Sequence, residues 1–329
     1  MSGRKMSYAG VRQKLPAVSR SIVIERPARE SLAKFIKKNW PLYVMIVPMF
    51  VYFLTFKYLP LLGIVIAFKD YNIFEGFLGS EWVGFQWFET LVTQPRMLNV
   101  FKNTVIFSFY QIVFAFPAPI ILALLLNEIR RTAYKRTIQT LVYLPHFLSW
   151  ALVYGLAYMM FSIQTGLVTQ LLARFGFEPI ALLQAPEYFR ALVVGAGVWK
   201  EMGWSTIIFL AALTGISPSL YEAAQVDGAN RWRQFVHITF PGLLPAIVIL
   251  MLLKIGNVLD VGFEQIYVFL SPMTYSVGEV LDTYAYRSGI VNGQFSITTA
   301  IGLSKSLIGF VLLVSVNRLS NKITGEGLY

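Results

Sequence analysis

Six stretches of this chain are apolar for long enough to cross a lipid bilayer, and this constrains the fold more than any other feature. A transmembrane helix needs about 20 mostly apolar residues to cross roughly 30 Å of hydrocarbon. The run from Asn103 to Asn127, for example, holds no charged residue. The predicted spans cover residues 41–66, 103–127, 138–161, 191–214, 242–263 and 295–317. We therefore expect an all-α, polytopic membrane protein with about six transmembrane helices.

The composition fits a membrane protein and narrows its chemistry. Only 14% of the 329 residues are charged and the mean hydropathy is +0.59, whereas about a quarter of a soluble domain is charged. Cysteine is absent, which excludes disulfides, thiol catalysis and cysteine-bound metal. The formal net charge of +11 could attract nucleic acid. Because the positive charge is concentrated in a few loops and the N-terminal tail, we expect contact with anionic lipid and no nucleic-acid partner.

The distribution of charge between loops predicts the orientation. Residues 1–40 hold ten Lys and Arg against two acidic residues, and the loop 128–136 holds four against one. The opposite loop, 67–102, has three basic and four acidic residues. Because basic loops stay on the cytoplasmic side, both termini are predicted to be cytoplasmic. Residues 1–40 form a predicted basic tail, with a short amphipathic helix near residues 31–40.

A spaced motif lies between the fourth and fifth spans, on the predicted cytoplasmic side. Residues 222–241 read EAAQVDGANRWRQFVHITFP, with the anchors Glu222-Ala223-Ala224, Gly228, Ile238 and Pro241. The spacing resembles the coupling loop of permease subunits of ATP-binding-cassette importers, although Phe240 stands where that family has Leu. An outer stretch with Trp82-Val83-Gly84, Phe88 and Asn103-Thr104 resembles carbohydrate importer permeases. The resemblance covers most of residues 41–325, which we expect to form one permease domain with a coupling loop at 215–241.

The residues of this loop predict its local structure. Ser217 and Pro218 are typical of a helix start, with an N-cap followed by proline at the first helical position. The helix should run to about Asp227, and Gly228 should then allow a sharp turn. A second amphipathic helix should follow and end at Pro241, which opens the fifth span. As an alternative to a partner contact, Glu222 fits a capping box at its own helix terminus.

The resemblance implies partners and a division of labour. Two ATP-binding subunits should each grip a coupling helix, and a second permease, generally a different homologous chain, should supply the second one. The chain lacks a GxxxxGK[ST] phosphate-binding loop, so ATP and magnesium should bind the partner ATPase and no cofactor this chain. An extracytoplasmic solute-binding protein should deliver the substrate to this bacterial inner-membrane protein. The expected docking residues are Glu222, Ala223, Ala224, Asp227, Gly228, Ile238 and Pro241.

Polar residues inside the predicted spans mark a candidate substrate path, because ionisable groups are costly in a membrane. In the fifth span, four polar residues recur three or four positions apart, which would place them on one helix face. In the fourth span, Glu201 should point about 100° away from Lys200. Mutual pairing that only holds the bundle together is the alternative. The candidates are Lys200, Glu201, Trp204, Lys254, Asn257, Asp260, Glu264 and Lys305.

The resemblance and the buried lysines together suggest a substrate. The resemblance implies oligosaccharide import, and lysines along the path would suit uronate chains such as alginate, since a buried carboxylate needs a counter-charge. A neutral oligosaccharide is compatible with the same residues. The alternative class is an ion-coupled secondary transporter with Glu201, Asp260 and Glu264 as proton carriers, but we see no inverted repeat. An enzyme is the weakest hypothesis, because the sequence shows no recognisable nucleophile, base and orienting group.

Overall fold

The computed structural model describes residues 37–178 and 181–324. The predicted tail and its amphipathic helix near residues 31–40 therefore lie mostly outside the described residues. The chain divides at Pro60 into two compact units, which we describe separately. In the first unit, the described residues 37–60 form one helical stretch whose α2 segment, Trp40–Phe53, buries no side chain.

The described residues are almost entirely helical, which confirms the all-α prediction apart from a two-residue antiparallel ribbon in the outer loop, where Lys69 pairs with Trp82. The remaining α-helices and strands are β1 (Lys69–Asp70), α3 (Gly76–Gly79), β2 (Glu81–Trp82), α4 (Gln86–Thr93), α5 (Pro95–Tyr110), α6 (Pro117–Asn127), α7 (Thr132–Tyr143), α8 (Trp150–Phe161), α9 (Leu167–Arg174), α10 (Pro186–Thr214), α11 (Pro218–Val226), α12 (Arg231–Gln234), α13 (Phe240–Gly256), α14 (Phe263–Phe269), α15 (Tyr275–Gly278), α16 (Leu281–Ala285) and α17 (Phe295–Thr324).

Shorter 3₁₀ and π turns join several of these helices into longer runs. The 3₁₀ turns are η2 (Leu59–Phe68), η4 (Leu144–Phe147) and η6 (Pro272–Thr274), and the π turns are η1 (Leu54–Tyr58), η3 (Gln111–Ala115), η5 (Phe235–Thr239) and η7 (Tyr286–Val291). Two π turns end just before a proline, η3 before Pro117 and η5 before Pro241. Proline cannot donate the normal backbone hydrogen bond, and a locally widened turn accommodates that loss without ending the helix.

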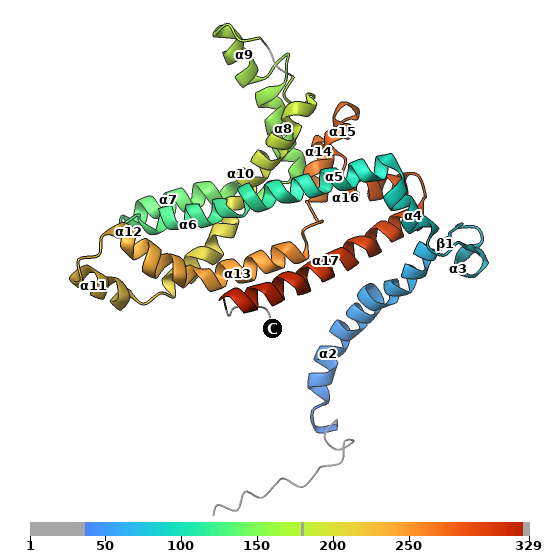
Figure 1. Ribbon diagram of the computed structural model, residues 1–329, viewed down its shortest axis with the longest axis horizontal. Coiled ribbons are helices and arrows are strands. Elements are labelled where there is room, and N and C mark those ends of the chain that lie inside the picture. Colours follow the sequence, from blue (N-terminus) through green and yellow to red (C-terminus); the bar gives the residue numbers. More distant parts are fainter. Residues whose placement is uncertain (1–36, 179–180, 325–329) are drawn as a thin grey trace, which may run out of the picture. The chain divides into compact units, whose positions relative to one another are not determined.

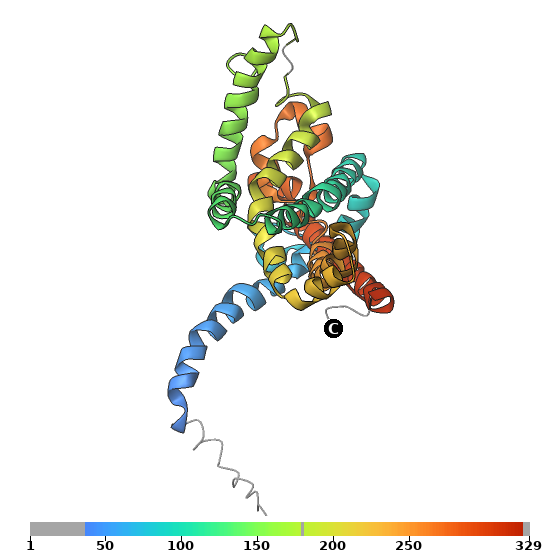
Figure 2. The ribbon, with the colours of Figure 1, turned by 90° about the vertical axis from the view of Figure 1, so that its left-hand side faces the viewer.

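Four helical runs among the described residues are long and apolar enough to cross a membrane: Trp40–Phe68, Pro95–Asn127, Arg231–Gly256 and Phe295–Lys322. Two further spans arise if each of two bent helix pairs crosses once. The number of four to six agrees with the prediction of about six. The third predicted span contains a bend of 105°, which Figure 2 shows as the turn from α7 into α8. Pro145 and the extended residues Leu148 and Ser149 cause the bend.

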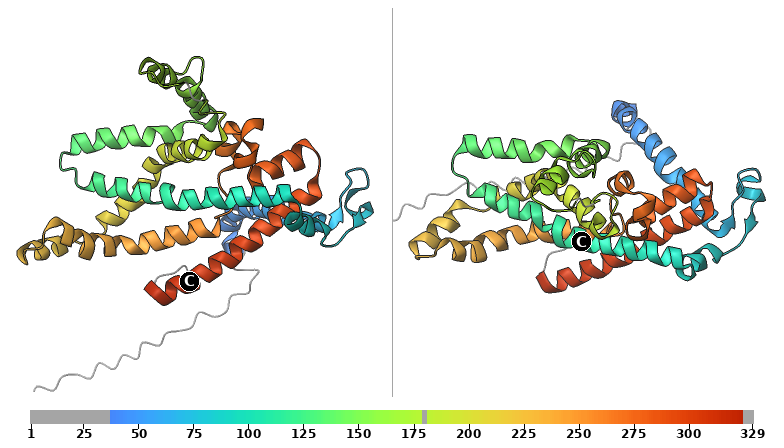
Figure 3. Two further views of the ribbon diagram at one scale, coloured as in Figure 1. Left: turned by 45° about the horizontal axis from the view of Figure 1, so that its top comes forward. Right: turned by 90° about the horizontal axis from the view of Figure 1, so that it is seen from above.

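The long helix α10 is central to the second unit. It packs against α6 and α7 on one side and against α13, α14 and α15 on others, and Figure 1 shows it crossing between them. One buried apolar cluster joins Ala123 of α6, Phe209 and Leu213 of α10, and Leu243 of α13. Helices α13 and α17 lie side by side in the views of Figures 1 and 3. These contacts fix the helices that surround the candidate path.

The fifth predicted span is not one helix. α13 ends at Gly256, residues 257–262 form an irregular connection, and α14 begins at Phe263. The Asn257 side chain donates to the Leu253 carbonyl at 3.1 Å and so occupies a carbonyl at the helix end. Gly262 has φ of +87°, in the left-handed region that glycine adopts without strain. The prediction of a continuous helix over 242–263 is therefore wrong.

Candidate functional site

The coupling loop forms two helices joined by a sharp turn. Ser217 is the N-cap residue of α11 and Pro218 its first residue, as predicted, but the Ser217 hydroxyl bonds to the Ser219 hydroxyl at 2.8 Å and caps no backbone group. Asp227 ends the helix, and Gly228 has φ of +74°. The next helix starts with a cap that we did not predict: the Asn230 side chain accepts from the backbone of Arg233 at 2.9 Å.

The motif residues at the start of this loop are largely accessible to a partner. Glu222 and Ala223 are exposed, and Ala224 is half-buried. Within the described part of the chain, the Glu222 carboxylate has no hydrogen-bond or ion-pair partner. The alternative of a capping box between Ser219 and Glu222 is wrong, because the N-cap residue is Ser217 and Ser219 already lies inside the helix. Asp227 and Gly228 are also exposed, so the turn is accessible.

We predicted that Pro241 would end the second helix, but the helix continues past it. The helix runs from Arg231 to Gly256 without interruption, because the π turn η5 precedes the proline and accommodates it. Ile238 is half-buried within that turn, and Pro241 is exposed just after it. The second helix of the loop and α13 therefore form one continuous helix.

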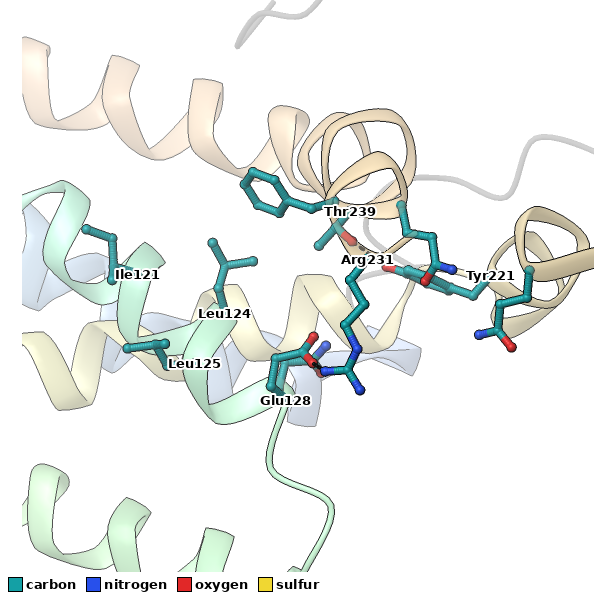
Figure 4. A pocket seen from close by; sticks show the side chains of 11 residues that line it. Ile121, Leu124, Leu125, Glu128, Tyr221, Arg231 and Thr239 are labelled. Atoms are coloured by element: carbon teal, nitrogen blue, oxygen red, sulfur yellow. Dashed lines mark hydrogen bonds and ion pairs between the residues drawn. The ribbon is translucent and has the colours of Figure 1, made fainter. Parts of the chain in front are cut away.

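A cavity of about 540 Å³ lies between the coupling loop and the end of α6 (Figure 4). Arg231 forms an ion pair with Glu128 at 2.9 Å, across two exposed side chains. A hydrogen bond of 3.0 Å joins the Tyr221 hydroxyl in α11 to the Thr239 hydroxyl in η5. Figure 4 shows Leu124 of α6 on the apolar wall of the same cavity. The Arg231–Glu128 ion pair thus attaches the coupling loop to the end of the second span. The Tyr221–Thr239 hydrogen bond joins the two helices of the loop to each other.

A second cavity of about 540 Å³ lies among α6, α10, α13 and the break in the fifth span. It brings together four of the predicted path residues, Glu201, Lys254, Asn257 and Asp260. Two polar residues that we did not predict also line it: Gln111 on the π turn η3, and Gln265 on α14, which donates to the Val193 carbonyl at 2.7 Å. The sequence signal for Gln111 was present, since it is a side-chain amide within an otherwise apolar span.

Lys200 and Glu201 form a pair, contrary to the prediction that they diverge. The Lys200 ammonium donates to the Glu201 carboxylate at 2.7 Å and to the His146 carbonyl at 2.9 Å, because its long side chain reaches back across the helix surface. The other Glu201 oxygen lies 2.7 Å from His146 Nδ1, and the His146 ring stacks on Trp204 at 4.6 Å. Lys200 is buried and, like Trp204, does not line the cavity. This network holds the bend of the third span against α10.

Two other predicted path residues also lie away from the cavity. Glu264 is exposed on α14, and the break at residues 257–262 separates it from the α13 face that carries Lys254. The predicted polar stripe on a single helix is therefore wrong. Lys305 of α17 forms an ion pair with Asp282 of α16, so the mutual-pairing alternative describes its geometry. The transport roles of all eight residues remain predictions.

Comparisons with known proteins place the chain in a transport context. Residues 115–325 match the family described as "Binding-protein-dependent transport system inner membrane component". The polygalacturonan/rhamnogalacturonan transport system permease protein YteP of Bacillus subtilis strain 168 is 46% identical over 95% of this chain and 98% of its own length. Protein LplB of the same organism is 44% identical over 89% and 92%. A chain in the crystal structure of a bacterial alginate ABC transporter in complex with an alginate pentasaccharide-bound periplasmic protein has a TM-score of 0.83 and 39% identity, over 91% of this chain and 100% of that one.

Proposed function

The chain belongs to the binding-protein-dependent transport system inner membrane component family, and we propose that it couples ATP hydrolysis on separate subunits to inward movement of acidic oligosaccharides. Family membership makes it a multi-pass permease of an ABC importer for sugars or oligosaccharides, rather than an enzyme. Membership in this family also argues against the alternative of an ion-coupled secondary transporter.

The exposed helix α11 is the observation that carries the coupling proposal. Glu222 is a free carboxylate beside the small side chains of Ala223 and Ala224, which allow close approach of a partner backbone. The two ATP-binding subunits, each loaded with ATP and magnesium, would close and pull such helices together. The continuous helix from Arg231 to Gly256 would carry that movement to the membrane cavity. In this arrangement both termini and the 215–241 loop face the cytoplasm, and residues 1–40 form a basic tail against anionic lipid.

The open side of the membrane cavity supports a second permease. Charged and amide groups that line an open groove at membrane depth are costly against lipid. A homologous permease that closes the groove would complete a path between the two chains, within the domain of residues 41–325. An extracytoplasmic binding protein would deliver the oligosaccharide to its outer end.

The relatives favour a uronate substrate. One is a permease for polygalacturonan/rhamnogalacturonan, and another solved homologue belongs to an importer of the acidic polysaccharide alginate, at 39% identity. Lys254 gives this chain a cationic group on the cavity wall. A carboxylate in such a path needs a counter-charge or hydrogen-bond donors, and the ammonium supplies both.

The direct test is co-purification with the neighbouring transport genes, followed by ATPase assays in lipid nanodiscs. We expect stoichiometric ATP-binding subunits and a second permease. We also expect hydrolysis to rise when a binding protein loaded with a uronate oligosaccharide is added. A chain that purifies without an ATPase, or hydrolysis that ignores every loaded binding protein, would refute the proposal.

A further inference from the structure

The Lys254 ammonium is bound by a neutral amide on the opposite cavity wall. Its Nζ donates to Gln111 Oε1 at 2.6 Å, across from α13 to the π turn η3. Asp260 lines the same cavity and its charge acts on Lys254, although no ion pair joins the two side chains within residues 37–178 and 181–324. The other cavity carboxylate, Glu201, is already held by Lys200. The group that accepts a hydrogen bond from the Lys254 ammonium is therefore a neutral amide.

The same Gln111 amide also holds the break in the fifth span. Its Nε2 donates to the Val261 carbonyl at 2.8 Å, and the Ser108 hydroxyl one turn earlier donates to the Val258 carbonyl. Both acceptors lie in the irregular connection between α13 and α14, where a carbonyl can lack the backbone donor that a continuous helix would supply. In a membrane these carbonyls need donors from a neighbouring helix. One side chain thus connects the cavity ammonium to the backbone of the broken span.

We propose that Gln111 is a clamp that determines specificity, and that a carboxylate of the passing oligosaccharide releases it. This inference rests on the function proposed above. A substrate carboxylate would accept from Lys254 Nζ in place of Gln111 Oε1, because a charge-assisted hydrogen bond is stronger than one to a neutral amide. The released amide would loosen its hold on Val261, so arrival of an acidic residue would free the segment 257–262 to move.

The exchange favours acidic over neutral sugars for a physical reason. A neutral hydroxyl offers Lys254 no more than the amide already does, so it gains little by displacing Gln111. A carboxylate gains an ion pair and replaces only a neutral contact, without breaking an existing ion pair. If Lys254 were already paired with Asp260, the carboxylate would have to compete with another anion.

The test uses the assembled transporter in nanodiscs, with its ATPases, second permease and binding protein. The two substrates are a uronate oligosaccharide and the same oligosaccharide with its carboxyl groups reduced to alcohols. Gln111→Glu places a permanent carboxylate beside Lys254. Gln170→Glu is the matched control, since it makes the same change on an exposed residue of α9 that does not line the cavity. The double variant Gln111→Lys with Lys254→Gln moves the ammonium to the other wall.

We expect Gln111→Glu to raise the half-maximal concentration of the uronate substrate at least about tenfold, or about 1.4 kcal/mol. Stimulation by the reduced oligosaccharide should stay within about twofold of wild type, and Gln170→Glu should change the half-maximal concentration of either substrate by less than about twofold. The double variant Gln111→Lys with Lys254→Gln should retain the preference for the acidic substrate. It provides a second test of the clamp if Gln111→Glu does not assemble.

Three outcomes would overturn the clamp. The first is an equal shift for both substrates in Gln111→Glu, which indicates a purely structural role. The second is a wild-type transporter that responds equally to the uronate and its reduced form. The third is a double variant that loses the acidic preference while assembling normally. A wild-type transporter that responds to neither substrate would instead refute the proposed function, and the clamp with it.

Discussion

Removal of Lys305 should destabilise the protein rather than alter its substrate range. Lys305 of α17 pairs with Asp282 of α16, and the two side chains are only 19% and 21% exposed. The second Asp282 oxygen is buried without a hydrogen bond in the described part of the chain. In Lys305→Met, the Asp282 carboxylate would lose its counter-charge at a site with only limited access to water.

The magnitude follows from the burial of the pair. Loss of one partner of a buried ion pair costs about 3–5 kcal/mol, because the remaining charge stays desolvated. At roughly 2 °C per kcal/mol for a large domain, the midpoint of thermal unfolding should fall by about 6–10 °C. The double variant Asp282→Asn with Lys305→Met removes both charges, so most of this loss should disappear.

Fluorescence-detected thermal unfolding of the detergent-solubilised complex measures both effects, and uptake of a radiolabelled oligosaccharide measures function. The single variant should lose uptake only as far as it loses folded complex, and the double variant should recover both. A single variant with an unchanged midpoint and no uptake would refute this reasoning. Lys305 would then act on the substrate, as the sequence had suggested.

Three further predictions concern the coupling loop and the packing of α10. Glu222→Ala should keep folding intact but reduce transport per ATP hydrolysed at least severalfold, and unimpaired coupling would contradict the docking proposal. Gly203→Ala should abolish stable expression, because the new methyl group meets a backbone carbonyl of α7. Gly195→Ala, with open space around it, is the control. Arg231→Glu should raise ATP hydrolysis that is not coupled to transport, and the added change Glu128→Arg should restore coupling. Because the pair is exposed, it should contribute only about 1 kcal/mol or less to stability.

The sequence predicted those parts of the fold that depend on local residue chemistry. Spans follow from apolar runs, and Gly228 followed from the need for a turn with positive φ. Proline was harder to interpret. Pro241 was predicted to stop a helix, but the effect of a proline depends on whether the preceding turn can widen, and nothing in the residue pattern signals a π turn.

The path residues could be predicted as a set but not as a geometry. A helix wheel assumes one continuous helix, so it placed Lys254 and Glu264 on one face; the break at Gly256 removes that relation. Lys305 was correctly identified as unusual, yet its partner lies on another helix and only the three-dimensional fold shows it. Gln111 was not predicted, because its role as a donor to a broken helix depends on the break near Val261, which only the fold shows.

The second span connects the two candidate sites, and this gives the cavity clamp a route to the coupling loop. The helical run Pro95–Asn127 carries Gln111 in its middle, and Glu128 follows its end. Seventeen residues at about 1.5 Å each place these two points roughly 26 Å apart along the helix. Gln111 contacts Lys254 near the end of α13 that lies far from the coupling loop. Glu128 pairs with Arg231, the first residue of the helical run that contains α13. Two antiparallel runs joined near both ends can tilt together but resist sliding past each other. A pull on the coupling loop should therefore reach the segment 257–262 with the clamp closed. Once a substrate carboxylate opens the clamp, the same pull can separate the two helices.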